Sequence, residues 1–267
     1  MQRRHSVRHL AWRGGIAVVA NALMFTGLYP LVPWAVRRLR REQPGPLRGA
    51  LREWAMSMLV SVARPAGHLP LPGAGARGPR PVIVLHGYAM NRANFVVLGS
   101  RLSRAGIGPI FGFEYWTFGR VAAAARQLGW FVDEVRAATG ADSVDIIGHS
   151  MGGVVGMYYV TLAGGDGVVT NLVTLGSPLH GTDVSAPLGH AGRELVMGSK
   201  LITRIAAAAV PTTTKVTNIW SKSDALVPGA AQKPLPGADT ILYDDLGHVA
   251  LLGSRRVANE IVSRLAK

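Results

Sequence analysis

The chain of 267 residues contains no cysteine. It therefore forms no disulfide and offers no thiolate to a metal ion, and its redox compartment does not follow from the sequence. Charged side chains are also scarce at 16%, whereas hydrophobic residues make up 48%. This composition excludes a disordered chain and is typical of a globular or partly membrane-associated protein. The length is sufficient for one α/β domain with a sizeable core.

Acidic residues are the scarcer charged type, with 15 acids against 29 lysines and arginines and a formal net charge of +14. The excess is concentrated in residues 1–64, which hold 11 arginines and only Glu42 and Glu53 as acids. Such a basic chain binds either nucleic acid or an anionic membrane. These arginines flank apolar runs and do not alternate with stacking aromatic residues. The sequence therefore favours a membrane surface as a partner and predicts no nucleic acid.

Residues 14–36 contain no charged side chain. As an α-helix this stretch would reach about 35 Å, enough for a hydrocarbon core of about 30 Å. Trp12, Tyr29 and Trp34 lie near its ends, where aromatic side chains favour the membrane interface. We predict a membrane-associated protein with a single uncleaved N-terminal anchor, because the arginine-rich run 37–41 follows the span instead of a small-residue cleavage site. A cleaved signal peptide and a hydrophobic helix packed on the protein itself are the alternatives. The arginines slightly favour a cytoplasmic catalytic side.

The chain divides into three predicted parts. Residues 1–64 form the basic membrane-anchor and amphipathic segment, 65–79 a linker rich in proline and glycine, and 80–267 the catalytic domain. Apolar residues recur at helical spacing from Leu47 to Val62, which predicts an amphipathic helix. That helix lies either in the membrane interface or over the catalytic domain.

Apolar strand-like runs alternate with helical patterns along the catalytic domain. Strands are expected at 81–85, 107–115, 144–148, 169–175, 215–220 and 240–243, and helices at 94–105, 118–138, 154–162, 191–209 and 254–265. This alternation predicts an α/β fold with a mostly parallel sheet that helices cover on both faces.

The sequence Gly148-His149-Ser150-Met151-Gly152-Gly153 stands between an apolar strand pattern and a helical pattern of small residues. A Gly-x-Ser-x-Gly motif in this context predicts a nucleophile elbow, in which a sharp strained turn exposes the serine hydroxyl at the edge of a sheet. The flanking glycines are needed because a Cβ would meet the neighbouring strand and helix. Ser150 is therefore the candidate nucleophile.

A serine hydroxyl needs a base to accept its proton. Of the histidines after Ser150, His248 stands between the last predicted strand and the closing helix, where a loop can return the imidazole to the elbow. His248 is the candidate base. His180 and His190 lie in a long segment after the 169–175 strand and are expected to be pocket or loop residues.

The candidate acid is Asp224, which follows a predicted strand and can orient the histidine and stabilise its cation. Asp244 and Asp245 are rivals, but they stand too close to His248 to belong to a separate loop. Asp183 has a weaker claim, as a residue of the pocket.

An oxyanion hole needs two backbone N–H groups directed at the developing negative oxygen. We predict that Met151, at the start of a helix, supplies one of them and Tyr88, after the first strand of the domain, the other. His86 precedes the serine and is expected to shape this loop rather than act as a base. His86, Gly87 and His149 complete the predicted substrate-binding set.

Five sequence blocks occur together in one order. They are Val84-Leu85-His86-Gly87-Tyr88, Gly148 to Gly153, Leu175 to Thr182, Ser223 to Pro228 and Gly247 to Leu252. In these blocks the domain from about residue 80 to 265 resembles the α/β-hydrolase superfamily, and within it the bacterial serine lipases and esterases. The Gly-Ser-Pro…Gly-Thr and Gly-His-x-x-Leu-Leu patterns look like the branch with triacylglycerol lipases and the minimal, class 2-like lipases. The resemblance implies hydrolysis of carboxylic esters, among them lipid acyl esters, by a Ser-Asp-His triad without a cofactor.

The sequence departs from the larger lipases of that group. The resemblance to them would imply a calcium site, with a carboxylate shortly after the histidine, and often a disulfide. Val249 and Ala250 follow His248 and cysteine is absent, so we predict no metal site and no disulfide. Residues 1–64 lie outside the resemblance. Two other functions stay open: an acyltransferase with the same triad, and a membrane-tethered binding protein without turnover.

Overall fold

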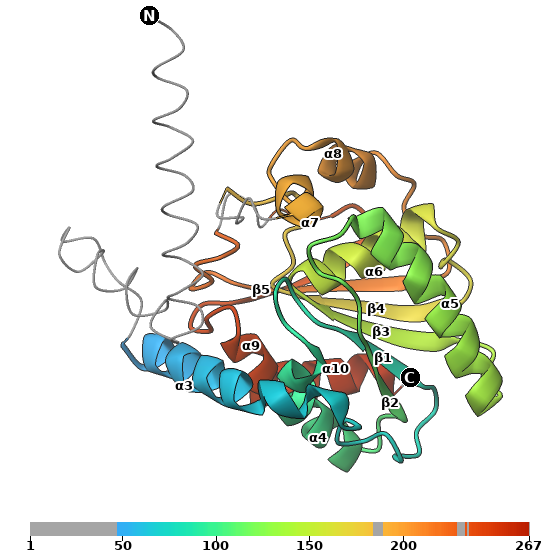
Figure 1. Cartoon of the computed structure of the whole chain (residues 1–267), viewed down its shortest axis with the longest axis horizontal. Helices are drawn as coiled ribbons and strands as arrows, with labels where there is room; N and C mark the ends of the chain where they lie inside the picture. The colour runs from blue at the N-terminus through green and yellow to red at the C-terminus, as the bar shows by residue number, and fades with distance from the viewer. Residues whose placement is uncertain (1–46, 184–188, 229–232, 234, 267) are drawn as a thin grey trace, which may run out of the picture.

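The structure, a computed structural model, describes residues 47–183, 189–228, 233 and 235–266 (Figure 1). The anchor predicted within residues 14–36 lies outside these residues. Among the helices that the structure describes, none is both long enough and apolar enough to span a bilayer.

The strands form one sheet. They are β1 (Val82–Leu85), β2 (Ile110–Phe113), β3 (Val144–His149), β4 (Val169–Leu175), β5 (Lys215–Ser221) and β6 (Ala238–Tyr243). Their order is β2-β1-β3-β4-β5-β6, and every neighbouring pair is parallel. The predicted parallel sheet is confirmed, with strand ends that differ from the expected ones by a few residues. The carboxyl ends of these strands meet at one edge, which is where ligands bind in sheets of this kind.

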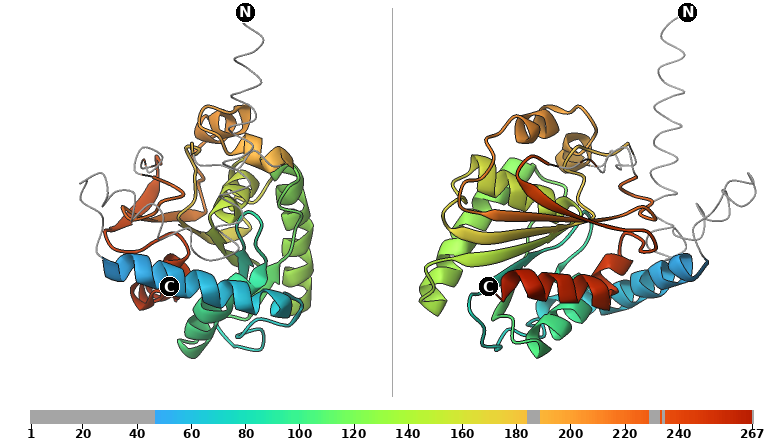
Figure 2. Two further views of the ribbon diagram at one scale, coloured as in Figure 1. Left: turned by 60° about the vertical axis from the view of Figure 1, so that its left-hand side comes forward. Right: turned by 180° about the vertical axis from the view of Figure 1, so that it is seen from behind.

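Helices cover both faces. The helices among the described residues, with η for a 3-10 helix, are α3 (Leu47–Ala63), η1 (Arg64–His68), η2 (Arg92–Phe95), α4 (Val96–Arg104), α5 (Val121–Thr139), α6 (Met151–Leu162), α7 (Gly189–Glu194), α8 (Lys200–Ala206), α9 (Ala250–Gly253) and α10 (Arg255–Leu265). Figures 1 and 2 show α5 and α6 on one side of the sheet and α3, α4, α9 and α10 on the other.

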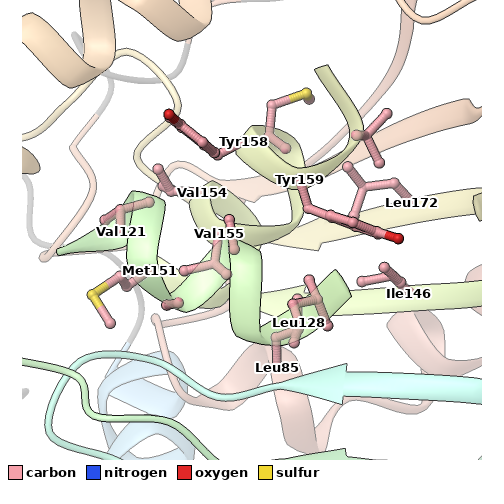
Figure 3. Packing of buried hydrophobic residues seen from close by; sticks show 14 of the residues in the cluster. Leu85, Val121, Leu128, Ile146, Met151, Val154, Val155, Tyr158, Tyr159 and Leu172 are labelled. Atoms are coloured by element: carbon pink, nitrogen blue, oxygen red, sulfur yellow. The ribbon is translucent and has the colours of Figure 1, made fainter. Parts of the chain in front are cut away.

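The two faces of the sheet have separate hydrophobic cores, because successive side chains of a strand point to opposite sides. In β1, Ile83 and Leu85 join the core under α5 and α6, whereas Val82 and Val84 join the core under α4 and α10. Figure 3 shows the first core at close range, with side chains of α6 packed between α5 and the strands. All four residues of β1 are buried, so both of its faces are covered, which explains why this strand is a continuous apolar run.

The segment expected as one helix at 191–209 forms two short helices, α7 and α8. The helix α7 ends at Glu194, and Gly198, with a left-handed φ of +72°, lies in the turn before α8. The hydroxyl of Ser199 then accepts the N–H of Ile202 at 3.2 Å and begins α8 as its N-cap. Apolar periodicity continued across this break, so the pattern alone did not indicate it.

The amphipathic helix α3 packs on the catalytic domain, one of the two placements that the sequence left open. Met56 and Val60 of α3 belong to the same core as Leu246 and Val249. The stretch predicted as a linker also packs there, since η1 begins it and Leu71 is only 7% exposed. Proline and glycine indicated a lack of regular structure, but they did not indicate a lack of packing. The described part of the chain from residue 47 is thus continuous with the domain predicted to begin at 80.

Candidate active site

Ser150 occupies the sharp turn between β3 and α6 with φ 56° and ψ −126°, a conformation that non-glycine residues rarely adopt. Close packing imposes the glycines on either side. A Cβ on Gly148 would lie 2.5 Å from the Cα of Gly153, and one on Gly152 would lie 2.2 Å from the carbonyl oxygen of Leu85. The motif therefore forms the strained elbow that the sequence predicted.

Asp224 and His248 form a buried pair. His248 Nδ1 lies 2.7 Å from Asp224 Oδ2, and each residue is only 2% exposed. The other carboxylate oxygen, Oδ1, accepts the backbone N–H groups of Leu226 and Val227 at 2.8 and 2.9 Å. This leaves the carboxylate only one orientation, and His248 Nδ1 carries the proton because a carboxylate accepts. The second ring nitrogen, Nε2, is then free of its proton and can act as a base.

The electrostatic surroundings favour a charged imidazole at His248. Burial lowers its pKa, but the charge of Asp224, the hydrogen bond that Nδ1 donates to Asp224 and the charge of Glu53 raise it, and the net pKa lies above the usual histidine value. The same groups would stabilise the imidazolium that forms when a base accepts a proton from serine.

The rival acids lie at the surface with basic partners. Asp244 Oδ1 is 2.7 Å from Lys222 Nζ, and its side chain is 75% exposed. Asp245 forms ion pairs with Arg52 at 3.3 Å and with Arg256. Among the described residues neither carboxylate pairs with an imidazole, whereas Asp224 does, so Asp224 stays the candidate acid.

The other candidates from the long segment after β4 stay apart from this pair. Asp183 is exposed, and His190 is an exposed residue of α7. His180 Nε2 lies 3.1 Å from the carbonyl oxygen of Lys233. Asp183 and His180 are loop residues, whereas His190 belongs to a helix and not to a loop.

His149 is completely buried, and its Nε2 donates to the carbonyl oxygen of His248 at 3.0 Å. The two rings lie 4.7 Å apart between centroids. Burial and the charge of His248 both lower the pKa of His149 well below its usual value, so this ring is neutral. The sequence assigned His149 to substrate binding. With no exposed surface it instead supports the backbone of His248 from below.

The segments that carry the two predicted oxyanion donors both lie next to the serine. Met151 is the first residue of α6, so its N–H has no acceptor within the helix and lies at the positive end of the helix dipole. The loop after β1 also comes close, since a Cβ on Gly87 would lie 3.0 Å from the Cβ of Ser150. Gly87 thus allows the loop with Tyr88 to lie against the nucleophile. The role of the Tyr88 N–H stays a prediction.

A hydroxyl that the sequence analysis missed fixes this loop. Ala89, the residue after Tyr88, has a left-handed φ of 54°, and its N–H donates to Thr117 Oγ1 at 3.1 Å. Thr117 is only 5% exposed. The strained backbone at Ala89 is therefore paired with a buried acceptor from a loop 28 residues further along the chain.

His86 lies beneath the loop and not in the path of a substrate, because only 1% of it is exposed. Its ring stacks on Tyr115 with a centroid distance of 4.6 Å, and Nε2 lies 3.3 Å from Glu114 Oε2. The hydroxyl of Tyr115 also donates to the His86 carbonyl oxygen at 2.5 Å. These contacts agree with the expectation of a loop-shaping residue and correct its assignment to substrate binding.

Aromatic side chains extend from the loop to the surface. The Tyr88 ring packs edge-on against Phe118 at 5.0 Å, and Phe118 contacts Trp116 at 5.1 Å. Trp116 is 74% exposed, an unusual position for tryptophan. Burial raises the pKa of Tyr88 to about 12, so its phenol stays neutral and contributes apolar surface.

Glu53 of α3 is the functional candidate that the sequence did not reveal. Its carboxylate is 4% exposed and accepts the N–H groups of Val249 and Ala250, the two residues after His248, at 2.8 and 2.6 Å. A Cβ on Gly247 would lie 2.4 Å from Glu53 Oε2, so the loop needs glycine there. The available signal was that Glu53 is the sole acid in residues 47–64, but it resembled an off-face charge.

Comparisons with known proteins concern the fold that carries these residues. Residues 80–198 match the family described as alpha/beta hydrolase fold. A lipase of Bacillus licheniformis in its mature form is 13% identical with a TM-score of 0.63, covering 72% of this chain and 95% of that one. Aspergillus fumigatus lipase B is 15% identical with a TM-score of 0.63, covering 78% of this chain and 58% of that one. A Paleococcus ferrophilus monoacylglycerol lipase is 14% identical with a TM-score of 0.55, covering 72% of this chain and 97% of that one. At such identities the likeness concerns the fold. Residues 80–198 thus resemble that family, and the chain has the α/β-hydrolase fold that these lipases share.

Proposed function

We propose that this protein is a serine hydrolase that cleaves carboxylic esters through an acyl-serine intermediate. The observation that carries the proposal is the buried Asp224–His248 pair at 2.7 Å. The carbonyl oxygen of His248 accepts a hydrogen bond from His149, the residue before the strained Ser150, so the pair is joined to the elbow. Buried titratable groups with a specific charge partner are concentrated at functional sites.

In the proposed reaction, Ser150 Oγ attacks the ester carbonyl carbon while His248 Nε2 accepts the hydroxyl proton. The oxyanion of the tetrahedral intermediate accepts the N–H groups of Met151 and Tyr88. The C–O bond to the alcohol then breaks, and His248 returns the proton to the leaving oxygen. Water then attacks the carbonyl carbon of the acyl-serine while His248 Nε2 accepts its proton. The C–O bond to Ser150 breaks, and His248 returns the proton to Ser150 Oγ, which releases the acid and restores the serine.

An apolar acyl chain is the substrate feature that the surroundings favour. Trp116, Phe118 and Tyr88 offer aromatic surface beside the oxyanion loop, and α7 lies next to Phe118, whose carbonyl oxygen accepts the N–H of His190 at 2.8 Å. We propose lipid acyl esters as the substrate class on this basis. Removing such a chain from water contributes roughly 25 cal/mol per Å² of apolar area.

An acyltransferase would use the same triad, with an alcohol in place of water. A tethered binding protein would keep the fold and need no reactive serine. A fluorophosphonate probe should label the wild type and leave Ser150→Ala unlabelled, and a folded wild type that resists the probe would contradict the hydrolase. Product analysis with p-nitrophenyl esters in water and with added glycerol separates hydrolysis from transfer.

We also propose an anionic membrane surface as a partner and a membrane-associated location. The outward face of α3 supports this, because Leu47, Leu51, Trp54 and Val62 are 48, 48, 38 and 77% exposed, while the sole acid of α3 is turned inward. Arg48 and Arg52 flank these side chains, a pattern that suits anionic headgroups. The full chain should float with vesicles containing phosphatidylserine, and a chain that begins at residue 46 should bind them more weakly. Equal recovery with neutral vesicles would contradict a role for charge.

A further inference from the structure

We propose that Glu53 is a positioning residue for His248: from a helix outside the family match, it holds the backbone of the base and adds a second negative charge beside the imidazole. The proposal rests on the proposed hydrolase function and extends it to α3, which lies within the predicted membrane-anchor and amphipathic segment.

Both carboxylate oxygens of Glu53 are used. Oε1 accepts the N–H of Val249 and Oε2 the N–H of Ala250, at 2.8 and 2.6 Å, where the chain leaves His248 and enters α9. Charge-assisted hydrogen bonds of this length are about twice as strong as neutral ones. A buried carboxylate with two donors in a fork orients the peptide groups it holds.

Three elements thereby hold His248 and the residue that follows it. Asp224 binds Nδ1 of its ring, His149 donates to its carbonyl oxygen, and Glu53 accepts the N–H of the residue that follows. The close approach of Gly247 to the Glu53 carboxylate fixes the preceding residue as well. The direction of Nε2 depends on all of these contacts, because the χ angles of His248 start from its backbone.

The charge of Glu53 acts on the same ring. The groups that face His248 are Asp224 from the loop after β5, the neutral His149 from β3 and Glu53 from α3, and Glu53 is one of the charges that raise the pKa of His248. The outer ion pairs of Asp245 with Arg52 and Arg256 are partly exposed and solvent screens them. Glu53 therefore stabilises the imidazolium in addition to Asp224.

The test compares Glu53→Gln with Ser57→Ala in the full chain. Gln keeps the shape and one acceptor but removes the charge and the second acceptor. Ser57 lies on the same buried face of α3, and its Oγ has no hydrogen-bond partner among the described residues. We expect Glu53→Gln to lower kcat by about 10- to 100-fold with little change of KM and to move the acid limb of the pH profile to lower pH. Ser57→Ala should match the wild type in both.

A purely structural role would lower the melting temperature and leave the pH profile and the kcat per labelled serine unchanged, and that result would overturn the proposal. If Glu53→Gln does not fold, Glu53→Asp decides: it keeps the charge but reaches only one N–H, so the acid limb should stay while kcat falls. Wild-type kcat in Glu53→Asp would then refute positioning. The pKa of the His248 ring, followed by NMR in the Ser150→Ala background, needs no turnover. It should fall in Glu53→Gln even if the ester-hydrolase proposal fails.

Discussion

Asp224 and His248 are joined at 2.7 Å, although 24 residues separate them in the chain and they follow different strands. The hydrogen bond is fully removed from water, so it holds the imidazole in the tautomer with a bare Nε2. We expect Asp224→Asn to lower kcat by about 10³- to 10⁴-fold, because the amide can donate to Nδ1 and stabilise the wrong tautomer. Steady-state kinetics of Asp224→Asn beside Asp244→Asn would check this. An Asp244→Asn variant with the greater loss would contradict the assignment.

The pH profile should reflect the raised pKa of His248. Catalysis needs the neutral ring, so kcat/KM should rise with pH through a midpoint above about 6.5, the usual histidine value. The stability contribution has the opposite direction: a raised folded-state pKa stabilises fully below the unfolded value, and that stabilisation is lost as pH rises through the folded value. Rates and thermal melts from pH 5 to 9 would check both. An acid limb below 6 would contradict the electrostatic picture.

The absence of a side chain at Gly176 leaves room for the Asp224–His248 pair. This glycine has a left-handed φ of 54°, and a Cβ there would lie 2.9 Å from Asp224 Oδ2 and 3.2 Å from His248 Nδ1. We expect Gly176→Ala to displace the carboxylate and lower kcat by about 100-fold. Gly198→Ala is the matched control, because Gly198 also has a positive φ but nothing lies within 4 Å of its would-be Cβ. Equal losses in the two variants would show that backbone strain and not displacement is the cause.

The elbow was predictable because its geometry is local: Gly148, Ser150 and Gly152 lie within one short stretch of the chain. The strands were predictable because dry faces demand apolar runs. Glu53 was not, because its partners Val249 and Ala250 are backbone groups almost 200 residues away and carry no sequence signal. Burial of His86 and His149 likewise depends on neighbours from other strands, so their assignment to substrate contact needed correction.

Asp166 should stabilise the connection that precedes β5. Its two oxygens accept N–H and O–H groups from Thr212, Thr213 and Thr214 at 2.7 to 3.1 Å. Burial raises the pKa of Asp166, but these hydrogen bonds lower it by more, so the net pKa lies well below the usual range. We expect Asp166→Asn to cost about 1 kcal/mol, the low end for a charged acceptor because solvent reaches the group.

The pH dependence follows from the lowered pKa of Asp166. The stabilisation is present above the unfolded value of about 3.9 and is lost as pH falls toward the folded one. The difference in melting temperature between the wild type and Asp166→Asn should therefore shrink in acid. Asp142→Asn, at an exposed position, is the control and should change little. A difference that grew in acid would contradict the role of these hydrogen bonds.

Trp116 should select for long acyl chains. It is 74% exposed in the structure and leads through Phe118 to Tyr88, so an acyl chain that covers it would remove aromatic surface from water. We expect Trp116→Ala to raise KM about 10-fold for p-nitrophenyl laurate and to leave the acetate nearly unchanged, since loss of an aromatic contact is worth roughly 1.5 kcal/mol. Trp130→Ala, which removes a 66% exposed tryptophan of α5, should alter neither. Equal changes for acetate and laurate would mean that Trp116 acts on the oxyanion loop and not on the chain.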